Sequence, residues 1–267
     1  MAKLRYKNVC ILIVTLLMML GNAVPVIASD EAPPLVAGQV VFAVGDAYVV
    51  SLSGPQKAMV GSIVLAGDRL VTGVNGYVHL RMADGAFLGV RSNSLLEVNE
   101  YMFDMTKPEN GRVRLFLKEG TVRAISGRIA DENKQNFRLN TPLAAIGVRG
   151  TDFIAAADQG STKVAVTSGG ISMSPYGERC VVVELGSCLG DHVIDLNAKR
   201  ANSFLVVRQG QAAVQVLNGD IETLFAPAHP QEKYDTNINL SHLDDGSLND
   251  DTSHVLTFES QKKMSEQ

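Results

Sequence analysis

Two of the three cysteines, Cys180 and Cys188, have the spacing that suggests the most definite chemistry in this sequence. A disulfide requires Cα atoms within about 7 Å, so the chain would have to reverse direction between them. Val181-Val182-Val183 favours a strand, which leaves Glu184–Ser187 for the reversal, where Gly186 could permit it. An oxidising compartment favours the disulfide, and two buried free thiols are the alternative.

Other residues that could act in catalysis or bind a metal are scattered. His79 lies in an alternating segment and is expected on a solvated strand face rather than as a base. Asp244-Asp245-Gly246 and the acids after it lack the oxygen spacing of an EF-hand loop. No nucleophile elbow, metalloprotease helix or phosphate loop occurs. We therefore predict no catalytic residue, no metal site and no cofactor. Three of the five histidines are too loosely spaced for a preformed metal site: His229, His242 and His254.

The first thirty residues have the pattern of an export signal. Three basic residues precede an apolar run of about twelve residues, from Val9 to Leu20, the length of a signal-peptide core. Val26-Ile27-Ala28 suits a signal peptidase, so we predict a signal peptide over residues 1–28 and a mature protein in the periplasm. The alternative is an uncleaved inner-membrane anchor facing the periplasm, since Val9–Ala28 approaches the spanning length of about 20 residues.

Charge argues against one class of partner. Removing residues 1–28 takes away three positive charges, so the formal net charge falls from -4 to about -7. An acidic chain without a cluster of lysine and arginine is a poor nucleic-acid binder. We expect no nucleic acid as a partner, and a membrane only if the signal segment is not cleaved.

Alternation of apolar and polar residues from residue 38 onward predicts β-strands. Val113, Leu115 and Leu117 should form one buried face. Alternation stops at Gly45-Asp46 and then resumes, which predicts a hairpin with its turn there. The predicted fold class is all-β, with many short antiparallel strands that form a β-roll or solenoid-like or sandwich domain.

A weak repeat also marks turns. Four segments share an apolar start, a turn pair and a glycine in the sixth position. Either stacked strand–turn–strand units or the ordinary reuse of hairpin turns would produce it. The glycines are Gly85, Gly120, Gly169 and Gly210.

The segment from Phe137 to Phe153 closely resembles the signature of the FecR family. In that family a strand ending in Thr-Pro, here Thr141-Pro142, leads to an apolar run and then to Gly-Val-Arg-Gly-Thr, here Gly147–Thr151. Supporting matches flank it in the family order: Gly67–Gly73, Asp84-Gly85, Glu119–Val122, Val164–Ile171 and Gly210-Gln211. The resemblance covers residues 38–217, which we take as a FecR-type β domain. The polar stretch 228–267 is predicted to be a flexible, disordered acidic tail.

Physical reasoning gives the signature a structural role. Pro142 fixes its own φ and biases Thr141 toward an extended conformation. Gly147 and Gly150 allow close backbone approach. Arg149 could donate to backbone carbonyls or to a carboxylate such as that of Asp152, which follows Thr151. We expect Arg149 to hold the fold rather than to contact a ligand.

Better-known FecR proteins are membrane-spanning regulators that pass a signal from an outer-membrane receptor to a sigma factor. Only eight residues precede the apolar segment here, so we expect no cytoplasmic part to hold a sigma factor. The resemblance implies a non-catalytic periplasmic module for protein interaction or signal sensing, with another envelope protein as its partner. The alternative is a cell-envelope glycan-binding or structural module, which the absence of Trp and the six Tyr disfavour.

Overall fold

The computed structural model describes residues 35–190, 192–200, 202–211, 213–221 and 225. The predicted signal peptide over residues 1–28 and the predicted tail over residues 228–267 lie outside the described residues. So do the three loosely spaced histidines and the acidic run after residue 243. No helix among the described residues is long and apolar enough to cross a membrane.

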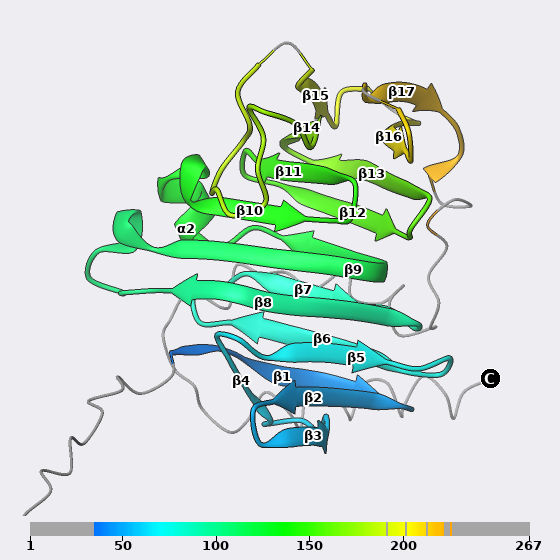
Figure 1. Cartoon of the computed structure of the whole chain (residues 1–267). Helices are drawn as coiled ribbons and strands as arrows, with labels where there is room; N and C mark the ends of the chain where they lie inside the picture. Colours follow the sequence, from blue (N-terminus) through cyan, green and yellow to red (C-terminus); the bar gives the residue numbers. More distant parts are fainter. Residues whose placement is uncertain (1–34, 191, 201, 212, 222–224, 226–267) are drawn as a thin grey trace, which may run out of the picture. The chain divides into compact units, whose positions relative to one another are not determined.

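The described residues form two β-sheets that share the long strand β9 (Arg112–Ile125) (Figure 1). Sheet A has the order β4–β1–β6–β7–β9–β12–β13–β16–β17. Its other strands are β4 (Ile63–Leu65), β1 (Val36–Val44), β6 (Tyr77–Met82), β7 (Phe87–Val90), β12 (Asp152–Ala157), β13 (Ser161–Ser168), β16 (Ser203–Arg208) and β17 (Gln215–Asn218).

Sheet B has the order β3–β2–β5–β8–β9–β10–β11–β14–β15. Its strands besides β9 are β3 (Gly54–Lys57), β2 (Ala47–Ser51), β5 (Arg69–Thr72), β8 (Ser94–Met102), β10 (Phe137–Asn140), β11 (Ala144–Val148), β14 (Gly170–Pro175) and β15 (Ile194–Asn197). The β9–β10 pair is parallel, and the other pairs of described strands are antiparallel. The short helices are η1 (Pro108–Asn110), α2 (Arg128–Glu132) and η2 (Lys134–Asn136). The all-β prediction is confirmed.

The chain passes between the sheets by bending, and this corrects one expectation. Gly45-Asp46 is not a hairpin turn, because β1 pairs with β6 in sheet A while its continuation β2 pairs with β5 in sheet B. Neighbouring strands bend beside it: the Gly73 N–H donates to the Asp46 carbonyl at 2.7 Å, and the Asn93 N–H donates to the Gly73 carbonyl at 3.1 Å. β9 bends beside them at Gly120. We call these neighbouring bends, at Gly45-Asp46, Gly73, Asn93 and Gly120, the first row of bends.

A second row of bends lies at the opposite end of the sheet A strands. Ala157 at the end of β12 pairs with Gly120, whereas Asp152 at its start pairs with Ile125. The passage from β11 into β12 is therefore far from the first row. β13 passes into β14 beside it, at Gly169.

The four repeat glycines have one backbone property in common but two structural settings. All four have positive φ, between 74° and 93°. Gly85 and Gly210 lie in hairpin turns, whereas Gly120 and Gly169 lie at bends between the sheets. The repeat thus marks positions where L-residues are strained, whatever the connection.

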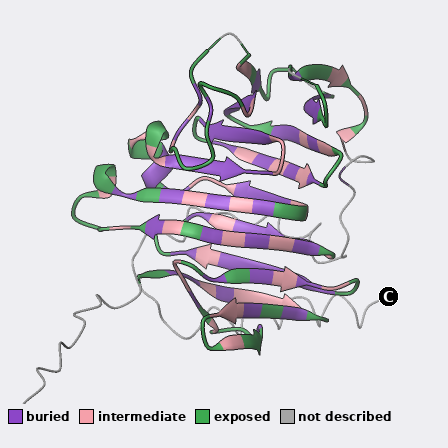
Figure 2. Cartoon of the chain, viewed as in Figure 1, coloured by how far each residue is buried: buried purple, intermediate pink, exposed green. Residues whose placement is uncertain are grey.

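One hydrophobic cluster joins the two sheets. It contains Leu80 and Val122 from sheet A with Leu70 from sheet B, all of them almost fully buried. The alternation predicted for β9 is confirmed, since Val113, Leu115 and Leu117 are buried while their neighbours are not (Figure 2). Each sheet buries the face that it turns toward the other, so the bends and turns lie at the ends of the strands.

Candidate functional site

The FecR-like signature forms the continuous path β10, β11 and β12, which crosses from sheet B to sheet A. Thr141 closes the turn between β10 and β11: its hydroxyl accepts from the Ala144 N–H at 3.0 Å. The same hydroxyl lies 2.9 Å from that of Thr162 in sheet A. Both threonines are fully buried, so Thr141 links the sheets at the turn that contains Pro142.

The bend at Arg149–Thr151 is held by backbone groups and one threonine. Gly150 and Gly169 both have positive φ, and a Cβ on Gly169 would lie only 1.8 Å from the Gly150 carbonyl oxygen. The Thr151 hydroxyl donates to the Gly170 carbonyl at 2.7 Å. The Thr151 N–H donates to the Ser126 hydroxyl at 3.0 Å. The side chain that ties this bend together is therefore Thr151.

The contacts predicted for Arg149, with backbone carbonyls or with Asp152, are wrong. Its side chain is 54% exposed and forms an ion pair of 3.2 Å with Asp195, which is 57% exposed. Asp152 binds a different arginine, since the Arg123 guanidinium donates to both of its carboxylate oxygens, at 3.0 and 2.7 Å. The glycines beside Arg149 bring backbone close to backbone and leave the long side chain outside.

The predicted disulfide between Cys180 and Cys188 is confirmed. The chain reverses within it, Gly186 has φ +67°, and Val181-Val182-Val183 forms no strand, contrary to expectation. We call residues 180–188 the disulfide loop. It packs on the signature, because a Cβ on Gly147 would lie 2.3 Å from the Ser187 hydroxyl oxygen. Gly147 thus makes room for the loop on β11.

Arg138 lies beneath the disulfide loop and is fully buried. Its guanidinium donates to the Asn140 side-chain oxygen at 3.1 Å and to the carbonyls of Gly186 at 3.1 Å and Val181 at 3.0 Å. The same guanidinium lies 3.4 Å from the sulfur of Cys180 and 3.1 Å from that of Cys188. Burial lowers the pKa of Arg138, and the negative charge of Glu184 acts against that shift. A buried cation therefore organises the loop through carbonyls and sulfur.

Asp84, which the sequence places at a turn, also connects distant segments. Its carboxylate accepts from the Ala86 N–H at 3.2 Å, from the Tyr101 hydroxyl at 3.1 Å and, at 3.4 Å, from the Ile129 N–H in the first turn of α2. Burial raises the pKa of Asp84 despite these donors, and it also raises the pKa of Tyr101. Asp84 is a structural acid that fixes α2 against the β6–β7 turn.

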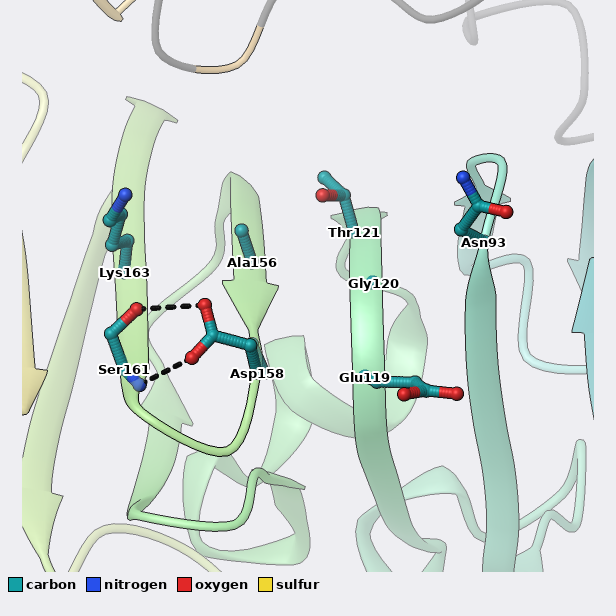
Figure 3. A pocket seen from close by; sticks show the side chains of 9 residues that line it. Asn93, Glu119, Gly120, Thr121, Ala156, Asp158, Ser161 and Lys163 are labelled. Carbon is teal, nitrogen blue, oxygen red and sulfur yellow. Dashed lines mark hydrogen bonds between the residues drawn. The ribbon is translucent and has the colours of Figure 1, made fainter. Parts of the chain in front are cut away.

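A hollow of about 360 Å³ lies beside the first row of bends (Figure 3). Its acid Asp158 is engaged locally, since it accepts from the N–H groups of Gly160 at 2.7 Å and Ser161 at 2.6 Å, and from the Ser161 hydroxyl at 3.1 Å. Glu119 and Lys163 complete its charged lining. None of its described lining residues is a histidine or cysteine.

His79, expected on a solvated face, is buried instead. Its ring packs edge-on against Phe87 and Tyr77, with centroid distances of 4.6 and 4.7 Å, and its Nε2 lies 2.5 Å from the Tyr77 hydroxyl. Within the described part of the chain, no group of three His, Cys, Asp or Glu side chains is placed to hold a metal ion.

Residues 68–172 match the sequence profile of the family described as FecR protein. This part of the chain is a FecR domain. It runs from the start of β5 into β14 and contains the signature bend and Arg138, but it ends before the disulfide loop. The match to this family supports a signal-sensing or regulatory role.

Two solved structures of a candidate anti-sigma factor from Parabacteroides distasonis ATCC 8503 are similar to this chain. Each is 14% identical and covers 59% of this chain, with TM-scores of 0.43 and 0.42. The protein spans 62% of each of those chains, less than two thirds of their length. No curated protein matches it significantly.

Sequence reasoning missed one residue that organises this region, Arg138, and gave Thr151 only as a member of the structural signature. Arg138 alternates with apolar residues in a short strand, and a fully buried arginine is rare. The signal that could have pointed to it was the phase of the alternation, since Arg138 and Asn140 share one face of β10. Thr151 belongs to the signature, but nothing in its type distinguishes it from a surface threonine.

Proposed function

We propose that the protein is exported and acts in the periplasm as a non-catalytic FecR-type module, which senses or relays a signal by binding another envelope protein. The FecR domain over residues 68–172 carries this proposal. The Cys180–Cys188 disulfide supports it, because such bonds persist in oxidising compartments. The signal-like pattern of residues 1–28 supports the same location.

The exposed apolar side chains favour a protein over a glycan as the partner. Glycan sites present exposed aromatic rings. Tyr77 and Tyr101 are buried here, and Tyr48, at 37% exposed, is the one aromatic residue among the exposed large apolar side chains of the described residues. The most exposed large apolar side chains of the described residues are aliphatic, with Leu52, Val74, Val183 and Leu189 above 70%. Aliphatic side chains suit the apolar core of a protein interface.

The test uses the full chain with a C-terminal tag, made in its native host. We expect the periplasmic extract to contain a soluble protein that begins at Ser29. Formaldehyde cross-linking followed by purification should recover one specific envelope protein, which an unrelated tagged periplasmic protein does not recover. Recovery in the cytoplasm with Met1 intact would contradict export. Enrichment of cell-wall glycan without any protein partner would favour the glycan-binding alternative.

A further inference from the structure

The disulfide loop presents its apolar side chains outward and its polar backbone inward. The carbonyls of Val181, Val182 and Val183 accept hydrogen bonds from the side chains of Arg138 at 3.0 Å, Asn140 at 3.0 Å and Arg114 at 2.5 Å, respectively. Those three donors lie on β9 and β10 of sheet B. The loop therefore lies over sheet B with its backbone bonded to it.

The valine side chains consequently face solvent. Val181 is 40% exposed, Val182 39% and Val183 72%, and Leu189, next to the disulfide, is 79% exposed. Apolar surface is more stable when it is removed from water, so three adjacent exposed valines are an unfavourable arrangement for the isolated chain. The polar contacts beneath the loop maintain it against that tendency.

The loop is also fixed in shape before any partner arrives. The disulfide closes it, and the Ser187 hydroxyl lies 2.5 Å from that of Ser172 on β14. A Cβ on Gly186 would lie 2.3 Å from the side-chain oxygen of Gln135, so the loop is wedged against η2. A loop ordered in advance loses little conformational entropy on binding. Exposed apolar groups on such a scaffold mark interaction sites.

We propose that the disulfide loop, with Val181–Val183 and Leu189, is the docking element of this protein and inserts into an apolar groove on a partner protein. The inference rests on the proposed function and names the surface that serves it. The loop lies outside the matched residues 68–172, whereas Arg138, Asn140 and Arg114 lie inside them. The FecR domain thus supplies the platform, and the added loop supplies the contact.

The size and chemistry of the loop select a groove over other occupants. A stable interface takes about 800 Å² from each partner, more than four aliphatic side chains supply by themselves. A groove encloses the side chains from several directions and recruits the loop flanks. A bilayer is a poorer match, because the loop has no aromatic ring and no cluster of basic residues for the interface.

The test places a photo-cross-linking residue in the full chain, in its native host. Val183→p-benzoylphenylalanine reports on the loop. Leu52→p-benzoylphenylalanine is the control, since Leu52 is exposed as well but lies in the β2–β3 turn at the other end of sheet B. We expect irradiation to link the Val183 variant, and not the Leu52 variant, to one protein. That protein is then purified and its affinity for the full chain measured.

Charge substitutions complete the test. Val183→Asp should weaken binding of the purified partner at least tenfold, whereas Leu52→Asp should leave it unchanged. Urea unfolding should show both variants folded like the parent, because both side chains are exposed. Replacing both Cys180 and Cys188 with alanine should also weaken binding, through loss of the fixed loop shape.

Each other outcome overturns the proposal in a distinct way. A partner linked through Leu52 but not through Val183 would retain the interaction function and reject the loop. A cross-link to a second copy would make the loop a self-association site. Partition of the parent, but not of Val183→Asp, onto anionic phospholipid vesicles would make it a membrane contact. Absence of a partner at both positions, together with a negative result in the tagged purification, would reject the proposed function as well.

Discussion

The signature bend, at Arg149–Thr151, and the disulfide loop each contain or contact an arginine, and the two arginines lie in opposite settings. At the bend, Arg149 is exposed and Thr151 is buried among backbone groups. At the loop, Arg138 is fully buried while the valines above it face solvent. The comparison shows that an arginine holds structure where unpaired carbonyls surround it. At the bend, Gly150 and Gly169 bring backbone against backbone, and the guanidinium of Arg149 lies outside, paired with Asp195.

The largest expected effect is at Arg138. Replacing it by methionine removes the guanidinium donor from the carbonyls of Gly186 and Val181, at about 1–3 kcal/mol for each buried acceptor left unsatisfied. The Asn140 oxygen keeps the Tyr176 hydroxyl as a donor, at 3.0 Å. We expect Arg138→Met to lower the free energy of unfolding by about 3–5 kcal/mol in urea denaturation. A loss below about 1 kcal/mol would mean that the loop holds its shape without the buried cation.

At the bend, the prediction concerns glycine. Gly169→Ala combines positive φ with a contact of 1.8 Å to the Gly150 carbonyl, so we expect a loss of about 2–4 kcal/mol. Gly210→Ala is the matched control, because its φ of +77° is nearly the same and no atom lies within 4 Å of the added Cβ. It should cost about 1 kcal/mol. Both variants are measured by thermal and urea unfolding. If they lose equal amounts of unfolding free energy, positive φ alone accounts for the cost at the bend.

The disulfide should contribute less than Arg138. In the loop-entropy model a closure over eight residues stabilises the fold by about 2.5 kcal/mol. We expect the variant with both Cys180 and Cys188 replaced by alanine to remain folded and to lose about this amount. An unfolded double variant would make the bond essential to the fold, in contrast with the view that Arg138 dominates the loop.

Asp84 offers a test by pH, away from both regions. Burial raises its pKa above the ordinary value of 3.8, so the folded protein binds this proton more tightly than the unfolded chain does. The stability that this raised pKa contributes is therefore fully present below about pH 3.8 and is lost as the pH rises through the folded-state pKa of Asp84. We expect the unfolding free energy of the parent to fall more steeply than that of Asp84→Asn as the pH rises above about 4. Identical slopes would contradict the raised pKa.

The smallest effect should come from Arg149. Its ion pair with Asp195 is exposed, and such pairs contribute about 0–1 kcal/mol. Arg149→Met should therefore change stability by less than about 0.5 kcal/mol, which makes it the matched control for Arg138→Met. A loss comparable with that at Arg138 would restore the fold-holding role first expected for Arg149.

Some features of this protein were readable from the sequence because they depend on local chemistry. Period-2 alternation predicted strands such as Val113–Leu117, and the repeat glycines lie at turns and bends with positive φ, because both follow from steric rules within a few residues. The cysteine spacing predicted the bridge between Cys180 and Cys188. The Gly-Val-Arg-Gly-Thr segment was sufficient to indicate the FecR domain.

The tertiary structure alone decided what these local features connect. Gly45-Asp46 has the residues of a hairpin turn but serves as a bend, because the partner strands of β1 and β2 lie in different sheets. The direction of an arginine depends on which carbonyls the rest of the fold leaves unpaired, and these lie far away in the sequence. Arg138 therefore binds a loop more than forty residues later, while Arg149, inside the most distinctive motif of the chain, points into solvent.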